Sequence, residues 1–163
     1  MDSLIQSIVE FFSSRIPNEL TVFIVSLFPV LELRGGLIAA RILNMDAIRA
    51  FIFCFIGNML PIPFILLFIR KIFDWLRHRK HIGKVIIRME KKAEKHRSTI
   101  EKYGVWGLLI VVAIPLPGTG GWTGALVAAI MDIRLRRALP VIALGVFIAG
   151  LIVGGISFGL FAA

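Results

Sequence analysis

Three long runs of the sequence contain no charged residue: 50–69, 103–131 and 138–163. Crossing the roughly 30 Å hydrocarbon core of a bilayer takes about 20 helical residues, and each run is long enough to do so. Hydrophobic residues make up 58% of the 163-residue chain, whereas soluble domains contain about 45–50%. The runs therefore predict an all-α integral membrane protein that crosses the bilayer more than once.

Residues 1–18 predict a helix lying on the membrane surface rather than a cleavable signal peptide. They carry Asp2, Glu10 and Arg15 and lack the basic leading region of a signal peptide. Their apolar residues recur at helical spacing, which is typical of an amphipathic interfacial helix.

Most of the positive charge lies between residues 70 and 102, which carry twelve Lys or Arg and four Asp or Glu. Excess Lys and Arg in a short loop beside membrane spans keeps that loop in the cytoplasm. Apolar residues recur here at near-helical spacing, so residues 71–102 are predicted to form a basic amphipathic helix resting on anionic lipid headgroups. This interpretation is preferred over nucleic-acid binding, and we expect no nucleic-acid partner.

The sequence repeats weakly when it is shifted against itself by 86 positions. Three pairs of residues then coincide: Pro29 with Pro115, Gly35 with Gly121, and Ala39 with Ala125. The Met-Asp pair at 45–46 also meets the Met-Asp pair at 131–132. Each copy follows the same order: an apolar arm, a proline break with glycines, a small-residue helix and a new span. We therefore predict two halves, 19–70 and 103–163, within a single membrane domain.

The arms around each break are too short to cross a bilayer. Residues 20–28 and 37–45 would each form about 13 Å of helix, or half of the hydrocarbon core. Re-entrant hairpins would also keep the arginines of 134–137 on the same side as the basic segment, as the positive-inside rule favours. Each half is then one hairpin plus one span, so two such halves must be inverted across the membrane, as in many transporters.

The first break places Glu32 and Arg34 at membrane depth, within an otherwise uncharged segment that is interrupted by Pro29. An uncompensated charge at mid-bilayer costs at least about 2.5–3.5 kcal/mol. In extended backbone, side chains two positions apart project to the same side and can pair. One interpretation is an ion pair that holds the hairpin tip together. In the other, Arg34, Gly35 and Gly36 bind an anionic headgroup, while Glu32 takes up and releases a proton.

The second break carries no charge but contains two prolines, Pro115 and Pro117, and four glycines. The helix that starts near Trp122 would turn its positive end toward membrane depth, and such helix starts accept phosphate or carboxylate groups. The alternative is a tight turn that simply requires glycine. In the first interpretation the second break completes the substrate site with four residues: Gly118, Thr119, Gly120 and Gly121.

The spans themselves carry less information. Asn58 either lines a cavity or bonds to a neighbouring helix, and the single cysteine, Cys54, is expected to pack inside an apolar run. The last span contains two GxxxG pairs, Gly150–Gly154 and Gly155–Gly159. Such pairs allow close helix contact, here either with the hairpins or across a homodimer.

The motifs PVLELRGG (29–36) and PLPGTGGWTGALVA (115–128) resemble the small multi-drug export protein family of bacterial and archaeal membrane proteins. That family in turn resembles the wider DedA/VTT superfamily. The resemblance implies a prokaryotic plasma-membrane protein with two opposed re-entrant hairpins, transporting drugs or lipids such as polyprenyl phosphates. It makes Glu32 and Arg34 the acid and the cation of the first hairpin, and places three residues at the turn of the second: Pro115, Gly118 and Gly121. Unlike DedA proteins, this sequence has Thr119 and no arginine in the second break.

Three classes of function follow from these patterns: a transporter of an anionic amphiphile such as a lipid phosphate, a proton-coupled exporter of small amphipathic cations, and a non-transporting membrane scaffold. The first is favoured because an arginine beside helix starts selects anions. The sequence contains no recognisable nucleophile–base pair, metal-ligand spacing or nucleotide-binding loop, so we expect neither an enzyme nor a bound metal or cofactor. The expected partners are the lipid bilayer and a second copy of the chain.

Overall fold

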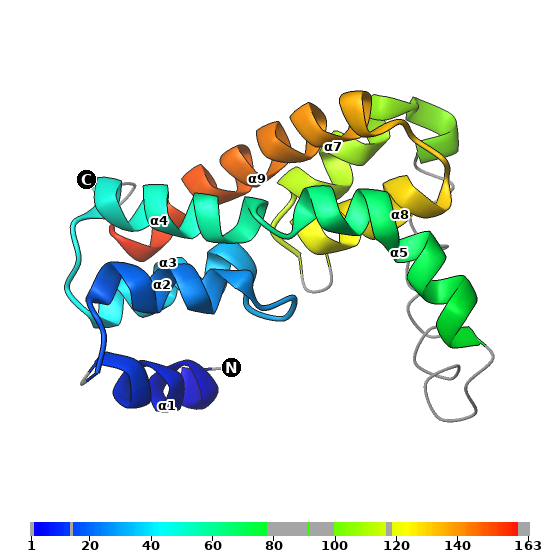
Figure 1. Cartoon of the computed structure of the whole chain (residues 1–163). Helices are drawn as coiled ribbons and strands as arrows, with labels where there is room; N and C mark the ends of the chain where they lie inside the picture. Colours follow the sequence, from blue (N-terminus) through cyan, green and yellow to red (C-terminus); the bar gives the residue numbers. More distant parts are fainter. Residues whose placement is uncertain (1, 14, 78–90, 92–99, 117–118, 160–163) are drawn as a thin grey trace. The chain divides into compact units, whose positions relative to one another are not determined.

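The computed structural model describes residues 2–13, 15–77, 91, 100–116 and 119–159. Within these ranges all regular secondary structure is helical, as Figure 1 shows. The chain divides into unit 1, Met1–Pro61 with Val146–Ala163, and unit 2, Ile62–Gly145. The basic helix predicted over 71–102 falls mostly outside the described residues.

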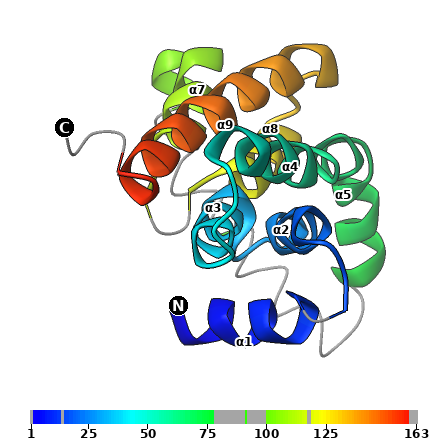
Figure 2. The ribbon, with the colours of Figure 1, turned by 90° about the vertical axis from the view of Figure 1, so that its left-hand side faces the viewer.

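Unit 1 is built on three helices that pack against one another: α2 (Asn18–Leu27), α3 (Glu32–Ile42) and α4 (Ala47–Met59). A further helix, α1 (Asp2–Ser13), contacts α2 and α3. Figure 2 shows α2 and α3 end-on and α1 from the side, so α1 runs across them. Ile5 and Val9 of α1 are buried while Gln6 and Glu10 are exposed, which is the amphipathic pattern expected from the sequence.

The tip of the α2–α3 hairpin is a turn of four residues, 28–31. The helix ends at Leu27 because the residue before a proline avoids helical backbone, and Phe28 is extended, with ψ 134°. The Phe28 carbonyl then accepts hydrogen bonds from the backbone N–H groups of Leu31 (3.2 Å) and Glu32 (2.8 Å). The proline break therefore closes as a tight turn, and α3 begins at once.

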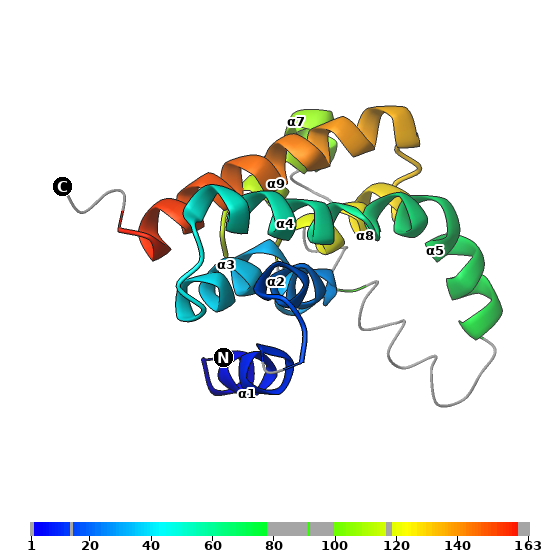
Figure 3. The same cartoon turned by 60° about the vertical axis from the view of Figure 1, so that its left-hand side comes forward.

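Unit 2 contains α5 (Ile62–Arg77), α7 (Val105–Ala113) and α8 (Gly121–Ile130), with α8 packed against α5 and α7. The long helix α9 (Leu135–Ser157) contributes residues 135–145 to unit 2 and its remainder to unit 1. Figure 3 shows α9 as one continuous helix, which contains Pro140. Within unit 2, α9 reaches α7 where Gly145 lies against Val112.

Among the residues that the structure describes, two stretches of helix are long and apolar enough to cross a membrane: Ala47–Ile69 and Leu135–Ser157, each of 23 residues. The first is divided at Leu60 and Pro61, where α4 ends and α5 begins. The uncharged run 103–131 behaves differently, because it is divided into α7 and α8, of 9 and 10 residues. A helix of that length spans about 15 Å, or half of a hydrocarbon core.

Corresponding positions of the two units differ by a fixed number of residues, and this difference is larger after the break than before it. Positions 28 and 114, the C-caps of α2 and α7, differ by 86. Positions 43 and 131, the C-caps of α3 and α8, differ by 88. The second break is therefore two residues longer than the first. Three predicted pairings are wrong, because a constant shift cannot absorb this insertion: Gly35 with Gly121, Ala39 with Ala125, and 45–46 with 131–132.

The difference of 88 residues matches Gly36 with Gly124, and the two glycines pack against corresponding residues. A Cβ atom on Gly36 would collide with Ser26 and Cys54 and crowd the backbone of Val22. A Cβ atom on Gly124 would collide with Val112 and touch the residues that match the other two, Leu108 and Ile142. Each unit thus holds the same local packing of first arm, second arm and following helix.

Candidate functional site

Glu32 has a positive backbone φ, as does the glycine at the corresponding position of the other copy. The φ of Glu32 is 51°, in the left-handed region, and that of the corresponding Gly120 is 133°. Left-handed backbone costs a residue with a Cβ atom about 1–2 kcal/mol, whereas glycine adopts it freely. The carboxylate side chain is also buried, with 6% of its surface exposed. Strained backbone of this kind is concentrated at functional sites.

Arg34 lies in the first turn of α3 and is half-buried. Its guanidinium group interacts electrostatically with the carboxylate of Glu32. The predicted extended backbone is wrong, because the helix resumes at Glu32, although the two side chains still interact. The arrangement leaves the acid buried and the cation accessible.

Gly35 and Gly36, which the sequence suggested as substrate-binding residues, lie inside α3 and are buried. Gly36 brings α3 against Ser26 and Cys54, and a Cβ atom on Gly35 would crowd the side chain of Leu31. The structure therefore shows both glycines in close packing, and their contact with substrate stays a prediction.

The second break is held by the hydroxyl group of Thr119. Its oxygen accepts a hydrogen bond from the Leu116 N–H (3.2 Å) and lies within donating distance of two carbonyls, Ile114 (2.7 Å) and Leu116 (2.8 Å). The predicted ligand donor is thus engaged with the backbone around Pro115. Gly120 and Gly121 are buried at the start of α8, while the predicted Pro117 and Gly118 lie outside the described residues.

The residues predicted for the site are divided between the two units. Glu32, Arg34, Gly35 and Gly36 belong to unit 1, and the described residues of the second break belong to unit 2. The participation of both breaks in one site stays a prediction.

An apolar groove of about 280 Å³ lies in unit 1 beside the charged break. Leu37 of α3 lines this groove, and it follows Arg34 by three residues, a spacing that makes side chains neighbours on a helix. The rest of the lining comes from α4, α9 and residues next to them: Ala47, Ile48, Phe51, Ile52, Phe147, Gly150, Leu151, Gly154, Gly155 and Phe158. Sequence analysis missed the groove because its walls come from segments about 100 residues apart.

The GxxxG pair Gly150–Gly154 forms part of this groove and packs within unit 1. A Cβ atom on Gly150 would collide with Phe51 and Leu33. A Cβ atom on Gly154 would meet only Leu37, at an ordinary contact distance of 3.7 Å. This pair therefore serves a contact within the chain.

Unit 1 also contains a buried polar cluster, Ser26, Cys54 and Asn58, that sequence analysis identified only in part. Ser26 and Asn58 are 0% and 1% exposed, and Cys54 is 0% exposed. Within the described structure, Asn58 Oδ1 has no hydrogen-bond partner, whereas the Ser26 hydroxyl group interacts with the Cys54 thiol. Asn58 is thus buried within the helix packing, and the hydrogen bond predicted for it to another helix is not formed by its carbonyl oxygen.

The same three positions of the other copy are apolar. The shifts of 86 and 88 match Ser26 with Val112, Cys54 with Ile142 and Asn58 with Val146, which are all buried. Packing of this frame therefore does not require polar side chains. The first copy is distinguished by both its charged break and its buried polar cluster.

These features define the class of the protein: its described residues are all-helical, with two helices long and apolar enough to cross a membrane and two half-length helical hairpins. The chain belongs to the family described as "Putative small multi-drug export protein", whose family model matches residues 32–152. The matched region includes Glu32, Arg34 and the second break. The description of the family names an export protein. No curated protein and no solved structure matches the chain.

Proposed function

We propose that the protein is a membrane transporter that carries an anionic amphiphile, of which a lipid phosphate is the simplest example. The observation that carries this proposal is the position of Arg34 on α3, three residues before the groove-lining Leu37. A guanidinium group binds phosphate or carboxylate through two parallel hydrogen bonds. The apolar groove next to it suits a hydrocarbon tail. Head and tail of an amphiphile thus find complementary surfaces on one helix.

Glu32 supports this role from its buried position. A charge at membrane depth is expensive unless it is compensated, and Glu32 lies close enough to Arg34 to interact with it. An arriving anion competes with the Glu32 carboxylate for Arg34. Protonation of Glu32 would release Arg34 to the substrate, which couples transport to proton uptake. Such a role explains why a glutamate is kept where the second copy uses glycine.

The proposed membrane arrangement is a pair of re-entrant hairpins, each followed by a span, inverted relative to each other. Support comes from the hairpins individually: Asn18, at the start of α2, and Asn44, just after α3, line one cleft. The two arms of the first hairpin therefore begin and end at the same level. Cysteine residues placed at 18 and 44 in a Cys54→Ser background should react with a membrane-impermeant maleimide from the same side, and labelling from opposite sides would contradict a re-entrant hairpin.

Transport is tested with purified protein in liposomes that contain a fluorescent short-chain lipid phosphate in one leaflet. Arg34→Ala should abolish translocation. Arg34→Lys should retain part of it, because a lysine keeps the positive charge but cannot form the two parallel hydrogen bonds of a guanidinium group. Arg41→Ala is the matched control, since Arg41 lies on the same helix but is exposed at its other end. Translocation by Arg34→Ala at the wild-type rate would exclude this site.

A second candidate, the export of small amphipathic cations in exchange for protons, is favoured by the family description and by the buried carboxylate of Glu32. The two candidates differ in which variant fails on which substrate. Cation export requires that Glu32→Gln abolish efflux of a lipophilic cation and that a pH gradient drive the wild type. Anion transport requires that Arg34→Ala abolish movement of the lipid phosphate. If the wild type and both variants move neither substrate faster than empty liposomes do, the chain acts as a scaffold and not as a transporter.

A further inference from the structure

The open ends of the two hairpins carry clefts that are formed by corresponding positions. In unit 1 the cleft is lined by Asn18, Glu19, Leu43, Asn44, Met45, Asp46 and Arg49. In unit 2 it is lined by Gly104, Val105, Met131, Asp132, Ile133, Arg134 and Arg137, with Ile100 in addition. Position by position, the first two members of each set differ by 86 and the other five by 88. The two clefts are therefore one feature of the repeat, built twice.

The chemistry of the two clefts is opposite. The unit 1 cleft contains two acidic side chains, Glu19 and Asp46, and one basic side chain, Arg49. The unit 2 cleft contains one acidic side chain, Asp132, and two basic side chains, Arg134 and Arg137. The change is largest where Asp46 of the first copy corresponds to Arg134 of the second.

An arginine at this position has no structural advantage for the helix that follows. Asp46 caps α4, because its carboxylate accepts hydrogen bonds from the N–H groups of Ile48 and Arg49, both at 3.1 Å. At the start of α9 the backbone carbonyl of Arg134 accepts from Arg137 and Ala138, at 2.8 and 3.0 Å. A guanidinium group carries no acceptor for the N–H groups of the first turn and adds positive charge at the positive end of the helix dipole. At this position the second copy therefore replaces the capping carboxylate by a cation, which is available to an external anion.

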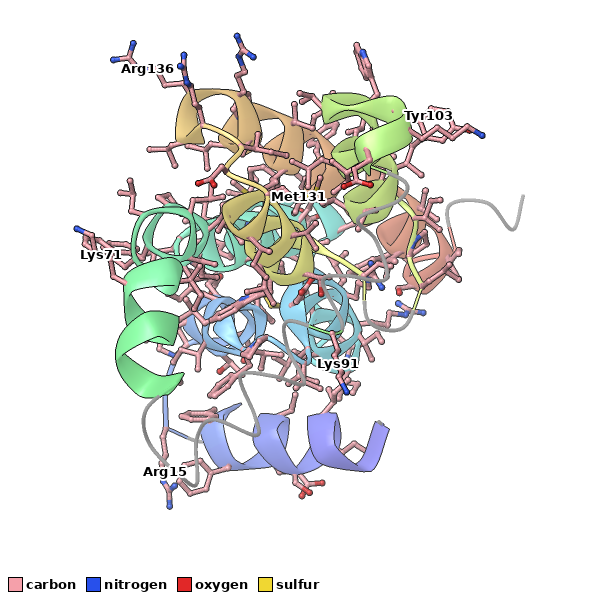
Figure 4. The ribbon with its side chains drawn as sticks, turned by 90° about the vertical axis from the view of Figure 1, so that its right-hand side faces the viewer. Arg15, Lys71, Lys91, Tyr103, Met131 and Arg136 are labelled. Carbon is pink, nitrogen blue, oxygen red and sulfur yellow. The ribbon has the colours of Figure 1, made fainter. Side chains whose placement is uncertain are left out.

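The surroundings of the unit 2 cleft place it at the level of lipid headgroups. It lies at the start of α9, a 23-residue apolar helix able to cross a membrane. Tyr103 and Trp106, at the start of α7, are 49% and 71% exposed, and such aromatic side chains are enriched at the membrane–water interface. Figure 4 shows Tyr103 and Arg136 projecting outward from the same end of unit 2. The cleft has a volume of about 460 Å³ and combines its charges with apolar walls from Ile100, Val105 and Ile133.

We propose that the unit 2 cleft binds the phosphate group of an anionic phospholipid of the surrounding membrane. Arg134 and Arg137 contact the phosphate oxygens, and the apolar walls contact the glycerol backbone and the first carbons of the acyl chains. A lipid is favoured over free phosphate because much of the lining is apolar. The cleft shares no residue with the break that contains Arg34. Lipid binding at the cleft can therefore be tested independently of the proposed transport.

The test measures lipid adducts of the purified full-length protein in detergent by native mass spectrometry. Dioctanoyl phosphatidylglycerol is titrated against dioctanoyl phosphatidylcholine, with inorganic phosphate as a competitor. Arg134→Ala/Arg137→Ala should weaken phosphatidylglycerol binding at least tenfold. The control, Lys102→Ala/Arg136→Ala, removes the same charge from exposed residues of unit 2 that do not line the described cleft, and it should bind like the wild type.

Arg134→Asp separates binding from folding, because it installs the capping residue of the first copy. This variant should unfold at a temperature equal to or higher than the wild type and still lose phosphatidylglycerol binding. An equal loss in the control variant would reduce the effect to net charge and overturn the proposal, as would unchanged binding in Arg134→Ala/Arg137→Ala. Displacement of the lipid by millimolar inorganic phosphate would assign the site to free phosphate instead.

Discussion

Replacing Glu32 by glycine and by alanine separates the backbone strain of the first break from its charge. Both variants remove the carboxylate, so the difference in their stability reports the backbone at this position, where φ is 51°. Alanine carries a penalty of about 1–2 kcal/mol in this conformation and glycine does not. Glycine loses about 0.5–1 kcal/mol more entropy on folding. Taken at the middle of both ranges, the net expectation is that Glu32→Gly is more stable than Glu32→Ala by about 0.7 kcal/mol.

This difference is measurable as a shift in unfolding temperature. With an unfolding entropy of about 2.1 cal/mol/K per residue, a chain of 163 residues changes its Tm by about 3 °C for each kcal/mol. Differential scanning fluorimetry in detergent should therefore place Glu32→Gly about 1–3 °C above Glu32→Ala. Neither variant should transport, because both lack the carboxylate.

The control for this comparison is Arg41, which is exposed in the last turn of α3 and has no positive φ. There the order should reverse, with Arg41→Ala more stable than Arg41→Gly by up to about 1 kcal/mol. If Glu32→Ala proved as stable as Glu32→Gly or more so, the backbone at Glu32 would not be strained. The argument from strain to function would then fail.

Four further variants test the packing and capping of the repeat by their unfolding temperatures. Gly36→Ala should lose about 1–3 kcal/mol because its Cβ would collide with Ser26, whereas Gly154→Ala should be neutral, and equal behaviour of the two would contradict the close approach of α3. Asn58→Val should hold or raise stability, by up to about 1–3 kcal/mol, because it removes a buried carbonyl oxygen that lacks a hydrogen bond in the described structure; a marked loss would show that this oxygen is satisfied. Asp46→Ala should lose about 1 kcal/mol with the cap of α4, and an unchanged Tm would show that the cap contributes nothing.

Local chemistry made much of the fold predictable from the sequence. Uncharged runs and helical spacing indicate helices wherever they occur, and the breaks follow from Pro29 and Pro115, because proline disfavours helix in the residue before it. The family resemblance, carried by the motifs around these two breaks, is confirmed by the match over residues 32–152. Each of these conclusions depends on residues that are close together in the chain.

Other features depend on tertiary structure and were mispredicted or missed. The helix begins again at Glu32 because hydrogen bonds to the Phe28 carbonyl close the turn at 28–31. The extended backbone inferred for Glu32 and Arg34 was therefore wrong. The two additional residues of the second break are hidden in a sequence comparison because glycines and alanines match at several shifts. The cluster of Ser26, Cys54 and Asn58 joins two helices, and nothing in the local sequence pairs them.

The most direct test of the central claim, that the charged copy of the break carries the substrate, compares Arg34→Ala with Arg41→Ala. Both lose one arginine from α3, and both are reconstituted at equal density in liposomes that carry a fluorescent lipid phosphate. The initial rate of translocation is then measured by dithionite quenching. The account predicts a rate indistinguishable from empty liposomes for Arg34→Ala and a wild-type rate for Arg41→Ala. Equal rates for the two variants would contradict it.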